Sequence, residues 1–367
     1  MIEQILVLLL LITCCSYAIV HVFLWKGLTG LSNPDSETLH SGISVIVAAR
    51  NEERNIVSLL RSLSELNYPS DTFEVIVVND RSTDGTDSVI KEFIHNRKNF
   101  RLITLTTNTS DMPNKKNALR SAIEQSSFAI VALTDADCIV PPQWLKEISR
   151  QFKDDVGVVA GYSPYSADNT STFLRFEEYM NSLTAAAAVG LNSAFMCTGR
   201  NFAYRKSVYK QLGGFEKIKH SISGDDDLFL QLVKSETQWK IRYMTSPESF
   251  VRTVPPSSFS QFVHQRTRHI SASAYYPKKI QLIYGLIHLF HFLVLVGFFI
   301  TPLPALIMLM VKFNFDGALC ARGKNIFGEE FSIQQFAFSE LLLIVYTFLI
   351  GPLGFIRSFD WKGTGSQ

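Results

Sequence analysis

Between residues 42 and 277 the chain alternates short apolar runs with longer, mixed segments. The apolar runs, most of them rich in β-branched residues, predict strands buried on both faces, at residues 43–49, 73–78, 102–105 and 128–133. The mixed segments predict helices at residues 51–66, 86–95, 116–125 and 228–235. Strands that alternate with helices form βαβ units, so the pattern predicts an α/β, Rossmann-like domain with a mostly parallel sheet.

Both ends of the chain are far more apolar than the middle. Residues 5–25 form a run long enough to cross a bilayer, because about 20 residues at 1.5 Å each span the hydrocarbon core. We favour a retained anchor at residues 1–27 over a cleaved signal peptide, since no positive charge precedes the run and Lys26 follows it.

The C-terminal region at residues 281–358 predicts about three further spans. They cover residues 282–300, 306–319 and 339–356, and the last two are open to a re-entrant or interfacial interpretation. Asp316 falls near one of them and is expected to face protein or water, because a charge in lipid is costly. The remaining middle of the chain, residues 40–277, is expected to form one catalytic domain.

Charge and cysteine usage exclude some classes of protein. A net charge of +2 without a run of Lys or Arg does not indicate a nucleic-acid binder. The five cysteines include no C-x-x-C pair, so we expect small buried or lipid-facing side chains in a reducing compartment. Lys26 weakly favours a cytoplasmic position for the domain that follows it.

Polar side chains follow the ends of three predicted strands. Arg50 and Glu52 follow the first strand, Asp80 the second, and Asp135 with Asp137 the fourth. Ligands of parallel α/β sheets bind at the carboxyl ends of the strands, so these groups predict one polar crevice. Carboxylates two residues apart suit Mg²⁺ or Mn²⁺, which also bind diphosphate oxygens.

A second acidic cluster, residues 224–227, precedes the predicted helix at 228–235. Three adjacent carboxylates repel one another, so one is expected to hold its proton more tightly. The alternative is an exposed helix N-terminus, where the backbone dipole favours Asp. The segment 265–269 offers a guanidinium pair, Arg266 and Arg268, suited to phosphate, or else a solvated helical face.

Together these motifs resemble the family 2 inverting glycosyltransferases of the GT-A fold. The resemblance covers about residues 43–276 and is strongest to membrane-bound members related to cellulose, hyaluronan and poly-N-acetylglucosamine synthases. It implies that Asp225 is the catalytic base and that Asp137 binds Mg²⁺ or Mn²⁺. It also implies a set of residues that bind the nucleotide-sugar, with Asp80 on the uracil ring: Arg50, Glu52, Asp80, Lys115, Asp135, Gln265 and Arg268.

The chain departs from the family's pattern at two positions. Gly224 replaces a glutamate before the base, and His269 stands where a tryptophan lines the acceptor site of processive synthases. The acceptor side implied by the resemblance comprises Gly199, Asn201, Asp226 and His269. The loop at residues 161–199 is expected to shape acceptor entry near the bilayer.

The resemblance implies a hexosyltransferase-type enzyme that moves a sugar from a nucleotide-sugar to a lipid-linked or glycan acceptor. The expected donor is a UDP-sugar. Nucleotide-sugars are cytoplasmic, so the catalytic domain is expected on that side of the plasma (inner) membrane. A processive polysaccharide synthase subunit and a catalytically inactive GT-A scaffold remain the alternatives. A dinucleotide-binding enzyme is excluded because no G-x-G-x-x-G follows the first strand.

Overall fold

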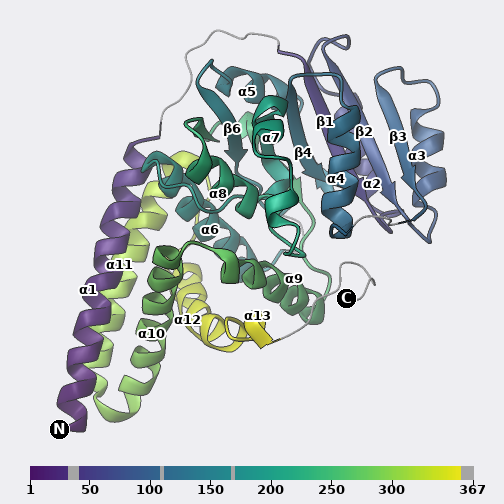
Figure 1. Ribbon diagram of the computed structural model, residues 1–367. Helices are drawn as coiled ribbons and strands as arrows, with labels where there is room; N and C mark the ends of the chain where they lie inside the picture. Colours follow the sequence, from purple (N-terminus) through teal and green to yellow (C-terminus); the bar gives the residue numbers. More distant parts are fainter. Residues whose placement is uncertain (32–40, 108–110, 167–169, 357–367) are drawn as a thin grey trace. The chain divides into compact units, whose positions relative to one another are not determined.

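The computed structural model describes residues 1–31, 41–107, 111–166 and 170–356 (Figure 1). The chain forms two compact units, each described here by itself. The sheet unit comprises the described parts of residues 32–168 and 192–255. The helical unit comprises residues 1–31, the described part of 169–191, and residues 256–356. Two helices that fall inside the expected catalytic domain at 40–277 therefore group with the apolar helices.

A seven-stranded sheet in the order β3-β2-β1-β4-β7-β6-β8 forms the centre of the sheet unit. Strands β3, β2, β1 and β4 run parallel to one another, whereas β7 is antiparallel to both β4 and β6. The predicted mostly parallel sheet is confirmed. Its strands are β1 (Ile43–Ala49), β2 (Phe73–Asp80), β3 (Phe100–Leu105), β4 (Ile130–Asp135), β6 (Val156–Gly161), β7 (Phe202–Arg205) and β8 (Lys240–Met244), and β5 (Cys138–Ile139) pairs separately with β9 (Arg252–Thr253).

Helices bury both faces of the interior strand β1. Every residue of β1 is buried, and Val45 and Val47 join a core with apolar residues of α2 and α5. Helix α4 packs against β1 and β2. The helices and short 3-10 turns of this unit are α2 (Ile56–Ser64), α3 (Thr86–Ile94), α4 (Asn114–Gln125), α5 (Trp144–Gln151), η1 (Gly199–Asn201), α7 (Lys206–Gln211), η2 (Glu216–Ile218), α8 (Asp227–Glu236) and η3 (Pro247–Ser249).

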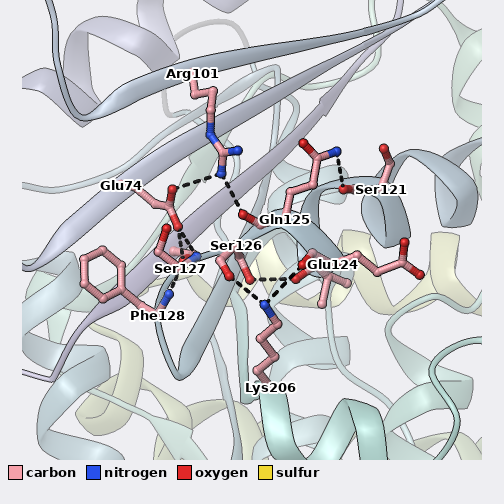
Figure 2. Close-up of polar contacts among 11 residues, drawn as sticks. Glu74, Arg101, Ser121, Glu124, Gln125, Ser126, Ser127, Phe128 and Lys206 are labelled. Carbon is pink, nitrogen blue, oxygen red and sulfur yellow. Dashed lines mark hydrogen bonds and ion pairs between the residues drawn. The ribbon is translucent and has the colours of Figure 1, made fainter.

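Charged side chains form hydrogen bonds with the connection between α4 and β4 (Figure 2). Lys206 donates to the carbonyl oxygen of Ser126 at 2.6 Å, and Arg101 donates to that of Gln125 at 2.9 Å. These cations satisfy carbonyls at the end of α4 that have no partner within the helix. Glu74 accepts from the Ser127 backbone N–H at 2.5 Å and pairs with Arg101 at 3.1 Å. These contacts stabilise the end of α4 and the loop that leads to β4.

Four helices of the helical unit are long and apolar enough to cross a membrane: α1 (Ile2–Thr29), α10 (Lys278–Ile300), α11 (Pro302–Phe327) and α12 (Ile333–Ile350). Pro302 lies at the start of α11, where a missing backbone N–H costs no hydrogen bond, so the helix begins there rather than at residue 306. The shorter elements are α6 (Thr172–Gly190), α9 (Phe259–Ala272), η4 (Ser273–Tyr275) and α13 (Leu353–Ile356).

The expectation of a loop at residues 161–199 is wrong, because the 19-residue helix α6 forms the middle of that segment. Its Ala-rich stretch is a strong helix former. The same small residues let α6 approach α1 closely, since a Cβ on Gly27 would lie 2.2 Å from the Ala187 carbonyl oxygen. Close backbone contact through Gly and Ala is how helices commonly pair in membranes.

A buried polar cluster ties three of the apolar helices together. Lys312 of α11 is fully buried, lies 2.6 Å from Asp316 and forms an ion pair with Glu340 of α12. Asp316 also accepts from the Tyr17 hydroxyl of α1 at 2.6 Å and lies 2.7 Å from the His21 ring nitrogen. Asp316 therefore faces protein, as its cost in lipid leads one to expect.

Candidate functional site

The turns that follow β1 and β2 hold each other through hydrogen bonds. Asn51 and Arg81 both have a φ of 53°, a left-handed conformation that is uncommon for residues other than glycine. The Asn51 backbone N–H donates to the Ser82 hydroxyl at 3.0 Å, and the Asn51 side chain accepts from the Thr83 N–H at 2.8 Å. Because these hydrogen bonds hold Asn51 in the turn, the helix predicted to start at residue 51 begins only at Ile56.

Asp80, at the end of β2, is 1% exposed and already carries a counter-ion. Arg81 pairs with both of its oxygens, at 2.8 and 3.2 Å, and a terminal nitrogen of Arg50 lies 4.0 Å away. The amino-acid pattern did not predict this pairing of Arg81. A nucleotide base that contacts Asp80 must share the carboxylate with Arg81 or displace the Arg81 side chain.

Glu52 lies in the turn beyond Arg50, where it contributes to the local fold. Its backbone N–H donates to the Thr86 hydroxyl at 2.8 Å, and its carboxylate accepts from the Asn55 side chain at 2.8 Å. Glu52 thereby joins the β1 turn to the first residue of α3.

Lys115, in the first turn of α4, brings two distant carboxylates together. Its ammonium nitrogen lies 3.0 Å from Asp135 at the end of β4 and 3.2 Å from Asp225 before α8. The Asp135 side chain is 34% exposed, whereas that of Asp225 is 5% exposed. Three segments that are separate in sequence therefore meet at one cation.

The three adjacent aspartates of the second acidic cluster have different partners. Asp226 accepts from the backbone N–H of Gly199 at 2.7 Å, and Asp227 accepts from that of Cys197 at 2.7 Å. Asp225 instead faces Lys115. Gly224 has a φ of +81°, and a Cβ there would lie 2.6 Å from the Leu228 side chain, so a glutamate at this position would not fit.

The pKa values of the first two aspartates move in opposite directions. Burial by itself raises the pKa of Asp225, but the charges of Lys115 and Lys116 outweigh it and hold the pKa below its ordinary value. Burial, followed by the charge of Asp225, raises the pKa of Asp226. Asp225 is therefore the carboxylate that stays ionised, and Asp226 is the one that holds a proton more tightly.

The side chain of Asn201, expected on the acceptor side, is fully engaged in contacts within the fold. It is fully buried, it accepts from the Trp144 indole N–H at 2.9 Å, and its amide donates to the carbonyls of Tyr162 and Ser249. Gly199 lies in η1, beside Asp226, and a Cβ on it would be 3.2 Å from the Asp226 carboxylate.

Gln265, Arg268 and His269 lie on α9 of the helical unit. The Gln265 side-chain oxygen is buried without a hydrogen-bond partner among the described residues, and Arg268 lies 3.1 Å from the His269 ring nitrogen. The expectation of a guanidinium pair for phosphate is wrong for Arg266. This residue is buried and forms an ion pair with Glu177 of α6, a pairing that no local pattern along the chain predicts.

The carboxylates at the end of β4 suit a small divalent cation. The described residues contain no group of three or more side chains that could hold a metal by themselves. Mg²⁺ is usually bound through one or two carboxylates together with substrate phosphates and water. Asp137, two residues beyond the partly exposed Asp135, is a ligand of the kind that such a shared site needs.

Residues 40–272 match the family model described as Glycosyltransferase like family 2. The chain is 30% identical over 186 residues to the glycosyltransferase AglE of Haloferax volcanii, which covers 50% of this chain and 58% of that protein. It is 34% identical over 122 residues to the poly-beta-1,6-N-acetyl-D-glucosamine synthase of Staphylococcus epidermidis, covering 33% of this chain and 28% of the synthase.

Among solved structures, the chain resembles the mannosyltransferase PcManGT of Pyrobaculum calidifontis, determined with GDP-Man and Mn²⁺. The TM-score is 0.62 at 18% identity, over 95% of this chain and 99% of that one, and this likeness supports the GT-A fold. The chain spans little more than half the length of AglE and still less of the synthase.

Proposed function

Because the chain belongs to the family described as Glycosyltransferase like family 2, we propose that it transfers a sugar from a nucleotide-sugar to a lipid-linked or glycan acceptor by inverting displacement. The observation that carries this proposal is Lys115, which joins Asp135 on the donor side to Asp225 on the acceptor side. The four apolar helices support a membrane-associated acceptor. We place the catalytic domain on the cytoplasmic side of the plasma membrane, where nucleotide-sugars are made.

In the proposed reaction Asp225 accepts the proton of an acceptor hydroxyl. The hydroxyl oxygen attacks the anomeric carbon from the face opposite the nucleotide, and the bond from that carbon to the diphosphate oxygen breaks. A depressed pKa keeps Asp225 ionised and ready for the proton. General-base help of this kind accelerates reactions by about 10²- to 10⁴-fold.

We propose that Asp137 binds Mg²⁺ or Mn²⁺ together with the donor's diphosphate. The ion would supply positive charge to the departing diphosphate without proton transfer. Asp80, Arg50 and Glu52 would bind the nucleotide, with a uracil base preferred. Gln265 and Arg268 would contact the donor, while Gly199, Asp226 and His269 would line the acceptor side.

The experiment is transfer by the purified full chain from a panel of UDP- and GDP-sugars, with Mg²⁺ or Mn²⁺ and with EDTA. Asp225→Asn should lower transfer by about 10²- to 10⁴-fold while nucleotide binding persists. Asp155→Asn is the matched control, because Asp155 is exposed and pairs only at the surface with Lys240. EDTA should abolish transfer.

Two results would contradict the proposal at different points. Near wild-type transfer by Asp225→Asn would remove the base assignment and direct attention to Asp226. If the wild-type chain neither turns over any donor nor gains thermal stability with nucleotides, the alternative of a catalytically inactive GT-A scaffold would be favoured. Mass spectrometry of products made with labelled donors separates single transfer from a growing polymer.

A further inference from the structure

Lys116, directly after the lysine that contacts the carboxylates, has a fully buried side chain. It lies in the first turn of α4 and contacts the segment directly before Asp225. Its ammonium donates to the backbone carbonyl of Ser221 at 2.5 Å and to that of Ser223 at 2.7 Å. A buried charge is costly unless it is hydrogen-bonded, and these carbonyls supply that compensation.

Residues 221–226, which receive this lysine, are an irregular segment that leads directly to Asp225. Ser221 and Ser223 are buried, so the carbonyls that Lys116 contacts are shielded from water. Without a cation they would be buried acceptors in a segment that has no helix or strand to pair with. Lys116 therefore supplies the hydrogen bonds that regular structure would otherwise provide.

We propose that Lys116 is a positioning residue for the catalytic base: by holding the carbonyls of Ser221 and Ser223, it fixes the segment that carries Asp225 against α4. The inference rests on the proposed role of Asp225. The two adjacent lysines then divide the work. Lys115 contacts the reacting carboxylate, and Lys116 fixes the backbone from which that carboxylate projects.

Position matters here because general-base catalysis depends on a short, well-aligned contact between base and hydroxyl. A displacement of about 1 Å at a reacting group can cost on the order of 10²-fold in rate. Burial raises the pKa of Asp225, and the charges of Lys115 and then Lys116 lower it below its ordinary value, so Lys116 also acts on Asp225 through its charge. Among the described residues, the other titratable groups that interact with Asp225 include Asp226, Cys197 and Tyr204.

The test compares Lys116→Met with a matched control, Lys206→Met. Lys206 also donates to backbone carbonyls, those of Glu124 and Ser126 at the opposite end of α4 (Figure 2). Rates are normalised to the folded fraction that binds nucleotide. Lys116→Met should lower kcat by about 10- to 100-fold with little change in the donor KM. The acid limb of kcat should move to higher pH, because losing the cation raises the pKa of Asp225. Lys206→Met should change neither.

Lys116→Gln, which keeps a neutral donor on a shorter stem, replaces the Met variant if that variant does not fold, with the same expectation. A folded Lys116 variant with wild-type kcat and an unmoved acid limb would overturn the inference. So would equal effects of the Lys116 and Lys206 substitutions, since both would then report general stability. If the wild type transfers sugar and Asp225→Asn does not, either overturning result contradicts the role of Lys116 and leaves the proposed function in place. Failure of the wild type to transfer sugar would instead contradict the proposed function.

Discussion

Lys115 lies between the carboxylates of Asp135 and Asp225, which are 90 residues apart in the sequence. Adjacent lysines in a sequence usually point in different directions along a helix, and here the difference separates their tasks. Lys115 points to carboxylates, whereas Lys116 points to buried carbonyls. The family resemblance implied a role only for the first.

Lys115→Met should affect donor binding as well as catalysis. Removing the ammonium leaves Asp135 and Asp225 without their shared counter-ion, so the pKa of Asp225 rises and the acid limb of kcat moves to higher pH. The donor KM should rise too, in contrast to Lys116→Met. The measurement is the pH dependence of kcat and of kcat/KM.

Lys91→Met is the control for Lys115, because Lys91 is 64% exposed and pairs with Asp87 on the surface of α3. It should leave both profiles unchanged. An unmoved acid limb in Lys115→Met would show that this lysine does not hold Asp225 ionised.

At the scale of elements, α1 and α6 contact each other through small residues. Gly27 of α1 and Gly190 of α6 face each other so closely that a Cβ on Gly190 would lie 2.0 Å from the Gly27 carbonyl oxygen. The neighbouring atoms are backbone, which cannot rotate away as a side chain can. The two helices can therefore pack this way only while both positions lack a side chain.

Gly27→Ala should destabilise the helical unit by about 1–3 kcal/mol, the usual cost of overpacking. Gly285→Ala is the matched control, since it also lies in an apolar helix and a Cβ there meets nothing within 4 Å. That change should be neutral or stabilise the protein by about 0.5–1 kcal/mol through helix propensity. Thermal unfolding in detergent measures both, and equal effects would contradict the contact.

At the scale of the whole molecule, the two units are stabilised in different ways. The sheet unit has an apolar core of alternating strand residues packed on helices. The helical unit adds to its apolar contacts the charged cluster around Lys312, where an ammonium meets two carboxylates. In an apolar surrounding such charges are retained only as a mutually paired set.

Lys312→Met should lower the stability of the helical unit by about 3–5 kcal/mol, because two buried carboxylates then lose their cation. Lys324→Met should cost less than about 1 kcal/mol, since Lys324 is 55% exposed in its pair with Glu330. Unfolding in detergent gives both values. Adding Asp316→Asn and Glu340→Gln to Lys312→Met should recover part of the loss; no recovery would mean that the charges are not paired as a set.

The amino-acid pattern by itself determined the elements whose burial is periodic. The strands at Ile43–Ala49 and Phe73–Asp80 and the apolar helices are readable because local apolar spacing and length decide them. The strand-end position of Asp80 and Asp135 is readable for the same reason. Helix α6 was not predicted, because its Ala-rich sequence, which also contacts another helix, shows no amphipathic stripe.

Only the tertiary structure decided which polar groups meet. Arg266 and Arg268 look alike in sequence, yet Arg266 pairs with Glu177, 89 residues away. Lys116 differs from Lys115 only by its place on the helix, yet its partners are carbonyls 105 and 107 residues further along the chain. Charge and hydrogen bonding act through space and have no period along the chain, so the side chains that carry and position the chemistry are fixed by the fold.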